Sequence, residues 1–402
     1  MRLKKGGGLS KHQILILNKI STLGIKRLPT DEYEVGSEFE TPDAILVRSA
    51  KMHDMDMPAS VQAIGRAGAG TNNIPVADMS KRGVVVFNTP GANANAVKEL
   101  VLTGMLMAAR NIGPAMTFVE GLEGDDATLS RLVEDGKKHF AGIELPGRTL
   151  GIIGLGAVGG IVADTALKLG MKVLGYDPEI TVDAAWRLSS EVKRVHGVDD
   201  VFKHSDFITL HVPLIDATRH LVNAERVGMM KHGAVLINFA REGVIDEQAV
   251  LDGLDSKKLR AYVCDFPTAR MKSHPGVVAL PHLGASTQEA EDNCAVMVVD
   301  QVREFLENGN ISNSINFPAV MMPREAAHRV AVASANIPNM VGQISTAMAK
   351  AEINIHNMVN KSRGDIAYTM LDLDSPAPET ALAEIRAIEG VMNVRVLPKR
   401  QE

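Results

Sequence analysis

The sequence predicts an α/β protein built around a doubly wound parallel sheet of the Rossmann type, with a smaller α+β module at its C-terminal end. Three observations carry this prediction. Short apolar, β-branched runs alternate with helical patterns along most of the chain. One of these runs opens onto a glycine-rich turn at residues 154–159. Beyond residue 328 the order of patterns becomes βαββαβ, which is typical of a ferredoxin-like module.

The glycine-rich turn predicts a dinucleotide site. Residues 149–153 form an apolar strand, and Gly154, Gly156 and Gly159 follow it in GxGxxG spacing. The first glycine permits the tight turn, the second lets backbone approach a pyrophosphate, and the third lets helix and strand pack closely. A helix over residues 157–169 then directs its N-terminal N–H groups at the phosphates.

An acidic residue closes the second strand of this unit. The apolar run 172–176 ends at Asp177, where a carboxylate accepts hydrogen bonds from an adenosine ribose. The same carboxylate repels a 2′-phosphate, so the sequence favours NAD over NADP as cofactor.

Composition bounds the remaining function classes. The 402 residues are enough for two or three domains, and the net charge of −5 with 4% aromatic residues argues against nucleic acid as a partner. No apolar run reaches the ~20 residues of a membrane span, and no signal peptide is recognisable, so a cytoplasmic location is expected. Cys264 and Cys294 lack metal-ligand spacing, and we predict no metal site.

Before the glycine-rich turn, apolar runs at residues 44–49, 61–70 and 84–91 predict a first βα domain. Arg48 and Arg66 lie near the ends of two of these runs, where strands of an open sheet border a ligand crevice; the alternative is a pair of surface arginines. A helix is expected over residues 96–109. The more polar stretch 113–147 is interpreted as an arm that either links two domains or contacts a partner subunit.

Three later strand ends carry polar residues: Arg241, Asp265 and His282. A nicotinamide-dependent alcohol oxidation needs a base for the hydroxyl proton, and histidine titrates in the right range. An arginine beside it can hold a substrate carboxylate with two hydrogen bonds. The competing interpretation of His282 is a hydrogen-bonded structural histidine.

The segments 64–73, 154–159, 237–246 and 281–287 resemble those of the D-isomer-specific 2-hydroxyacid dehydrogenases. The resemblance implies a flavodoxin-like substrate-binding domain made of residues 1–97 and 287–320, with a Rossmann-type NAD-binding domain, residues 98–286, inserted between them. It also implies that residues 328–402 form an ACT regulatory domain, joined by the connector 311–323.

The resemblance further implies NAD-dependent oxidation of 3-phospho-D-glycerate to 3-phosphohydroxypyruvate, the first step of L-serine biosynthesis. Alternatives are another D-2-hydroxyacid as substrate, or a non-enzymatic NADH-sensing corepressor. Implied catalytic residues are Arg241 and His282. Implied substrate contacts are Arg48, Arg66, Gly68, Ala69, Gly70 and Arg241. Implied cofactor contacts are Ala69, Gly154, Gly156, Ala157, Val158, Gly159, Asp177, Val212, Pro213, Phe239, Ala240, Arg241, Asp265, His282, Gly284 and Ala285.

The chain departs from the family pattern both near His282 and in the ACT domain. The family pairs its histidine with a glutamate that follows the Asp265 position, but no acid lies between Asp265 and His282 here. Either Asp265 or Glu242 takes over this role, or the histidine works as a weaker base. In the ACT domain, Ser334 stands where serine-sensitive members have a histidine.

The ACT resemblance nevertheless implies an amino-acid effector, L-serine or another, at a seam between two copies of the chain. Asn336 and Asn354 match the amide positions that contact it, although Asn339 replaces a glycine nearby. A homodimer or homotetramer is therefore expected.

Overall fold

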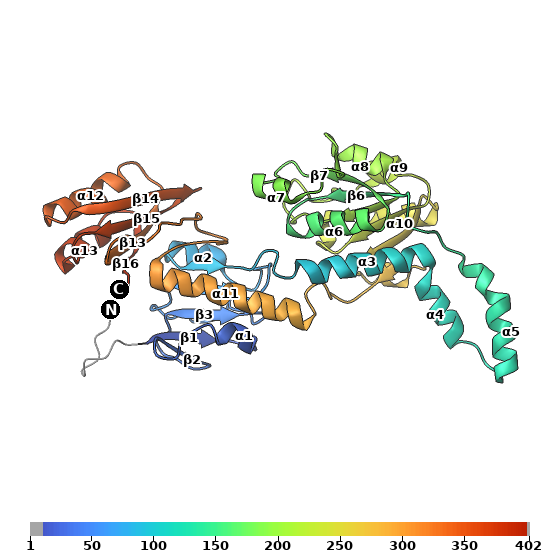
Figure 1. The fold of residues 1–402 in the computed structure, drawn as a ribbon, viewed down its shortest axis with the longest axis horizontal. Helices are drawn as coiled ribbons and strands as arrows, with labels where there is room; N and C mark the ends of the chain where they lie inside the picture. Colours follow the sequence, from blue (N-terminus) through green and yellow to red (C-terminus); the bar gives the residue numbers. More distant parts are fainter. Residues whose placement is uncertain (1–10, 400–402) are drawn as a thin grey trace. The chain divides into compact units, whose positions relative to one another are not determined.

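The computed structural model describes residues 11–399 and divides into two compact units. Unit one holds residues 11–92 and 291–399, and unit two holds residues 93–290. The chain thus leaves unit one, builds unit two without interruption, and returns (Figure 1). Within residues 11–399, no helix combines the length and apolar character needed to cross a membrane.

Unit two contains a seven-stranded, all-parallel sheet in the order β12-β11-β10-β9-β6-β7-β8. Counted from β6, this is the 3-2-1-4-5-6 order of the predicted Rossmann fold with one added strand. The strands are β6 (Thr149–Ile153), β7 (Lys172–Tyr176), β8 (Lys193–Arg194), β9 (Phe207–Leu210), β10 (Ala234–Asn238), β11 (Leu259–Cys264) and β12 (Val277–Ala279).

Helices cover both faces of this sheet, which explains why the central strands β9 and β10 are buried at every position. One face packs against α3 and α6, and the other against α8, α9 and α10. The helices of unit two are α3 (Ala94–Arg110), α4 (Ile112–Glu120), α5 (Asp126–Gly136), η1 (Lys137–Phe140), α6 (Ala157–Lys168), α7 (Val182–Arg187), α8 (Val198–His204), α9 (Ala224–Met229), η2 (Glu242–Val244), α10 (Glu247–Asp255) and η3 (Met271–Ser273).

The stretch expected to be a polar arm forms the helices α4 and α5, which project from the rest of unit two (Figure 1). Asn111, in the left-handed conformation, ends α3 and starts α4 in a new direction. The α4 residues Met116 and Val119 are 57% and 54% exposed. An apolar helix face left open to solvent is typical of a surface that another chain covers.

In unit one, a five-stranded parallel sheet has the order β2-β1-β3-β4-β5, which is the flavodoxin-like order. One face packs against α11 and the other against α2. The strand β2 was not predicted, because it is short and only its first residue is buried. The elements are β1 (His12–Ile16), α1 (Thr22–Ile25), β2 (Tyr33–Gly36), β3 (Ala44–Val47), β4 (Ala63–Arg66), α2 (Val76–Lys81), β5 (Val85–Phe87) and α11 (Gln288–Asn308).

The C-terminal module has the predicted βαββαβ order and an antiparallel sheet, β14-β15-β13-β16. Its helices α12 and α13 cover one face of that sheet. The other face joins the core of the five-stranded sheet, with Tyr368 and Met370 packing in the same cluster as Phe305 and Phe317. The elements are β13 (His328–Ala335), α12 (Met340–Lys350), β14 (Ile355–Arg363), β15 (Ile366–Leu373), α13 (Glu379–Arg386) and β16 (Val391–Val396).

A fully buried ion pair holds the module to the connector before it. Arg329 donates from Nε and Nη2 to the two oxygens of Asp372, at 2.6 and 2.8 Å. Its remaining N–H groups donate to the carbonyls of Asn308, Met322 and Pro323, at 2.9 to 3.0 Å. All five donors of the guanidinium are therefore used, and the charge is neutralised inside the protein.

We expect Asp372→Ala to lower the free energy of unfolding by about 3–5 kcal/mol, because it leaves a buried guanidinium without its counter-charge. The double variant Arg329→Met/Asp372→Leu should recover part of the loss, since it removes both charges but leaves the carbonyls of Asn308, Met322 and Pro323 without their donor. Chemical denaturation followed by circular dichroism measures the change. Glu379→Ala, which breaks an exposed ion pair with Arg386 on α13, serves as the control and should cost under about 1 kcal/mol. A loss at Asp372 no larger than at Glu379 would contradict the assignment.

Candidate functional site

The glycine-rich turn adopts the conformation that its spacing predicts. Gly154 has φ +93°, and a Cβ there would collide with the carbonyl of His211. A Cβ on Gly159 would collide with the carbonyl of Gly154, so only glycine lets α6 pack this close to β6. A Cβ on Gly156, the N-cap of α6, would meet nothing within 4 Å. Open space in front of a helix N-terminus is what a bound pyrophosphate requires.

Asp177 closes the same turn from the neighbouring strand. Its Oδ2 accepts from the backbone N–H of Leu155 at 2.8 Å, and its Oδ1 accepts from that of Glu179 at 2.9 Å. The carboxylate is half-buried, and each oxygen keeps a lone pair for a further donor. The turn and the acid are thus held together before any ligand binds.

His211 follows β9, the strand that lies beside β6 on the side away from β7. Burial lowers the pKa of His211 to about 4, so its ring is neutral at pH 7. Its Nε2 lies 3.0 Å from the hydroxyl of Thr209. The expected cofactor contacts Val212 and Pro213 follow it directly.

Arg241 follows β10 in a turn that Asn238 organises. The Asn238 side chain accepts from the N–H of Ala240 at 3.1 Å and donates to the carbonyl of Arg241 at 2.9 Å. The Arg241 side chain is exposed and donates to the Ala240 carbonyl at 2.7 Å. Asn238 was not predicted as a site residue, although an asparagine at the end of a buried strand is typical of a turn.

Asp265 follows β11 and is 2% exposed, yet neither of its carboxylate oxygens has a hydrogen-bond partner within residues 11–399. Burial raises the pKa of Asp265 to about 6, against the opposing effects of nearby backbone amides and of the charge on Arg241. Buried carboxylates without donors are rare in native proteins. A hydrogen-bond donor on a bound ligand would give the Asp265 carboxylate its missing partner.

His282 follows β12 and is exposed, with its ring centroid 4.4 Å from that of Phe266. A Cβ on Gly284 would lie 3.8 Å from Oδ2 of Asp265, so the loop after His282 passes beside this acid. In unit two, the structure thus places Arg241, Asp265 and His282 after three adjacent strands at one edge of the sheet.

In unit one, Arg48 and Arg66 lie beside each other at the ends of β3 and β4. The Nε of Arg66 donates to the carbonyl of Arg48 at 3.0 Å. Glu291, at the start of α11, pairs with Arg48 at 2.8 Å, and Asn18 accepts from the Arg48 backbone N–H at 2.9 Å. Glu291 was not predicted, because 243 positions separate it from its partner (291 − 48).

The expected substrate loop follows β4 directly. Gly68 has φ +145°, and a Cβ there would collide with the guanidinium of Arg66. The amide of Asn88 donates to the carbonyl of Ala69 at 2.6 Å, and the backbone N–H of Thr89 donates to that of Gly68 at 3.2 Å. Asn88 and Thr89, which directly follow β5, therefore hold the loop in place. Asn88 is a second residue that was not predicted from the sequence.

The other expected site residues lie in the loops and helix ends that these contacts define. Ala157 and Val158 are the first residues of α6, and Phe239 and Ala240 precede Arg241. Gly70 ends the substrate loop, and Ala285 follows Gly284. Within residues 11–399, no group of three or more His, Cys, Asp or Glu side chains is arranged to hold a metal ion.

Asn336 and Asn354 do not meet within one copy of the chain. Asn336 follows β13 and donates to the Gly364 carbonyl at 3.0 Å, while Asn354 precedes β14 and donates to Asp374 at 2.7 Å. Both strands are antiparallel to β15, so the two amides lie at opposite ends of the sheet. Strand geometry separates them by roughly 25 Å.

Comparisons with known proteins identify the family. Residues 102–284 match the model of the D-isomer specific 2-hydroxyacid dehydrogenase, NAD binding domain. D-3-phosphoglycerate dehydrogenase of Methanocaldococcus jannaschii is 33% identical over 374 residues, which cover 91% of this chain and 68% of that protein. The enzyme of the same name from Bacillus subtilis is 32% identical, and the match spans 77% of this chain but only 59% of that enzyme.

Solved structures agree with this result. The NAD⁺-bound 3-phosphoglycerate dehydrogenase of Entamoeba histolytica superposes with a TM-score of 0.60 and 26% identity, covering 76% of this chain and 99% of that one. A D-2-hydroxyisocaproate dehydrogenase superposes with a TM-score of 0.62 at 25% identity, over 76% of this chain and 99% of that chain. The chain belongs to the family of D-isomer-specific 2-hydroxyacid dehydrogenases and carries its NAD-binding domain.

Proposed function

We propose that this protein oxidises 3-phospho-D-glycerate to 3-phosphohydroxypyruvate with NAD, the first step of L-serine biosynthesis. The observation that carries the proposal is the placement of Arg241, Asp265 and His282 after three adjacent parallel strands, at the same end of the sheet as the glycine-rich turn. Relatives named D-3-phosphoglycerate dehydrogenase support this choice of substrate over other 2-hydroxyacids.

The residues of unit two fit the cofactor. The open space at Gly156 accommodates a pyrophosphate, and Asp177 has acceptor capacity for ribose hydroxyls. The two unpartnered oxygens of Asp265 match the N–H groups of a carboxamide, which nicotinamide carries. When bound, NAD accepts the hydride that leaves the substrate carbon.

The chain's own groups supply the rest of the chemistry. We assign the substrate carboxylate to the Arg241 guanidinium, which lies exposed at the end of β10. We assign the hydroxyl proton to an imidazole nitrogen of His282, which acts as general base. The ring contact with Phe266 limits where that imidazole can point.

Unit one supplies the contacts that select the substrate. Arg48 and Arg66 form a cationic pair whose orientation Glu291 and neighbouring backbone fix, and we assign the substrate phosphate to this pair. The backbone of residues 68–70 is assigned to the carboxylate end of the substrate, because its conformation is fixed and Gly68 admits close approach.

We further propose that the protein works as a homo-oligomer in the cytoplasm. The open apolar face of α4 supports contact with a second copy. The separation of Asn336 from Asn354 supports an amino-acid effector site shared by two copies, since one copy cannot bring both amides to one small ligand. L-Serine is the effector that the resemblance favours. Two buried free thiols, Cys264 and Cys294, agree with a reducing compartment.

His282→Ala should lower kcat by on the order of 10²–10⁴-fold while NADH binding stays within a few-fold, because the general base is lost and the other expected cofactor contacts remain. Steady-state NADH formation and fluorescence titration of NADH measure the two effects. His232→Ala, an exposed histidine of the same domain, is the control. Near-normal turnover in His282→Ala would refute the assignment.

Asp177→Ala should weaken NAD binding at least about tenfold more than NADP binding, because only NAD offers a 2′-hydroxyl to the carboxylate. Asp177 also holds the turn through Leu155, so part of the loss will affect both cofactors equally. The ratio of the two dissociation constants, measured by calorimetry, isolates the ribose contact. An unchanged ratio would show that Asp177 serves the turn alone.

A further inference from the structure

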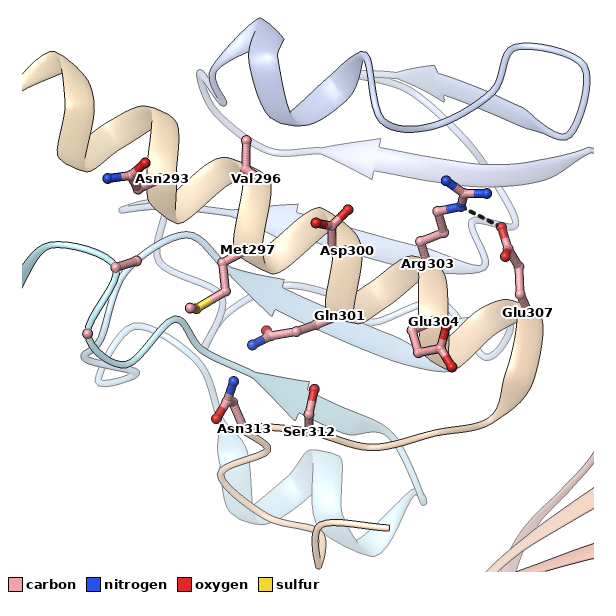
Figure 2. Close-up of a pocket in the computed structure, with 12 residues that line it drawn as sticks. Asn293, Val296, Met297, Asp300, Gln301, Arg303, Glu304, Glu307, Ser312 and Asn313 are labelled. Atoms are coloured by element: carbon pink, nitrogen blue, oxygen red, sulfur yellow. Dashed lines mark hydrogen bonds and ion pairs between the residues drawn. The ribbon is translucent and has the colours of Figure 1, made fainter. Parts of the chain in front are cut away.

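Unit one contains a pocket of about 830 Å³, largely open to solvent, that no part of the proposed reaction uses; we refer to it as the cavity (Figure 2). It lies between α11, the loop after β5 and the loop after α11, and none of the expected cofactor, substrate or catalytic residues lines it. Its volume is within the range of sites that bind small molecules.

Gln301 of α11 has a buried side-chain amide without hydrogen-bond partners within residues 11–399. Its side chain is 6% exposed, and neither Oε1 nor Nε2 has a hydrogen-bond partner among the described residues. It lines the cavity, and Figure 2 shows it extending from α11 toward Asn313. Buried amides nearly always have partners. A ligand seated against this amide would supply the donor and the acceptor that the described residues do not provide.

Other polar groups face the same volume. Asn293 of α11 and Asn313 of the following loop add two further amides, and Ser312 adds a hydroxyl. Met297 contributes an apolar wall from the same helix (Figure 2). A carboxamide presents a donor and an acceptor in one plane, which pairs with the matching edge of a nucleobase. Hydroxyls and amides beside it suit the hydroxyls of a sugar.

The side chains that line the cavity carry more negative than positive charge, which disfavours an anionic ligand. Asp300, Glu304 and Glu307 line the cavity, and Arg303 is the single cationic side chain among the residues that line it. Glu307 accepts from Arg303 at 2.8 Å, and Asp300 pairs with Arg27. The surplus of carboxylates disfavours phosphorylated ligands, including the substrate proposed above.

We propose that this cavity is a second ligand site, which binds an uncharged nucleoside through the amide of Gln301. The site is separate from the cofactor and substrate residues, and the proposal does not depend on the reaction assigned to them.

Adenosine titrated into the full-length protein by calorimetry tests the proposal. The protein is first saturated with NADH, so that the dinucleotide site cannot take up the probe. We expect one adenosine site per chain at probe concentrations up to about 10 mM. Gln301→Leu should weaken binding about tenfold or more, because the base loses its paired amide. Gln301→Met is a second variant that retains side-chain length, in case the leucine variant fails to fold.

Two controls make the result specific. Gln343→Leu, an exposed glutamine of α12, should leave adenosine binding unchanged. AMP should bind at least about tenfold more weakly than adenosine, because its phosphate meets the carboxylates. Absence of adenosine binding to the wild-type protein, equal binding to a folded Gln301 variant, or equal affinity for AMP and adenosine would each overturn the proposal.

Discussion

The close approach of α6 to β6 is the constraint on which the rest of unit two depends. A side chain at Gly154 or Gly159 would collide with backbone, so the turn exists only because both positions lack a Cβ. Asp177 then ties the turn to the end of β7 by accepting from the backbone N–H of Leu155. Once these contacts form, the helix N-terminus, the acid and the ends of β9 to β12 all face the edge of the sheet at which a dinucleotide binds.

Local patterns were enough to predict the fold class and most strands of the sheets. The glycine spacing, the buried strands and the polar residues at strand ends are all encoded over a few positions, and the structure has the Rossmann order and the ferredoxin-like order that they predict. Strand β8, with two exposed residues, leaves no comparable pattern. Helices α4 and α5 were not predicted, because the glycines and charged residues of the stretch 113–147 indicated a polar arm.

Long-range contacts could not be predicted from the same patterns. Glu291 reaches Arg48 only because α11 returns to the first sheet, and Asn88 fixes Ala69 only because β5 lies beside β4. Each is an ordinary polar residue in the sequence, and its role comes from the fold. The identity of the carboxylate partner of His282 remains a prediction, with Asp265 and Glu242 as the alternatives.

The C-terminal module shares a hydrophobic core with the five-stranded sheet, and Arg329 links it to the connector by donating to the carbonyls of Met322 and Pro323. An effector that binds between two such modules would therefore act on unit one directly, with no flexible linker to take up the strain. The module would then act on the part of the chain that carries Arg48 and Arg66.

The measurement that tests the central claim most directly is the rate of NADH formation by the purified protein across a panel of D-2-hydroxyacids. The account predicts a kcat/KM for 3-phospho-D-glycerate at least about 10²-fold above those for D-glycerate and D-lactate, because only the phosphorylated acid engages the arginine pair. An equal or higher kcat/KM for an unphosphorylated acid would contradict it.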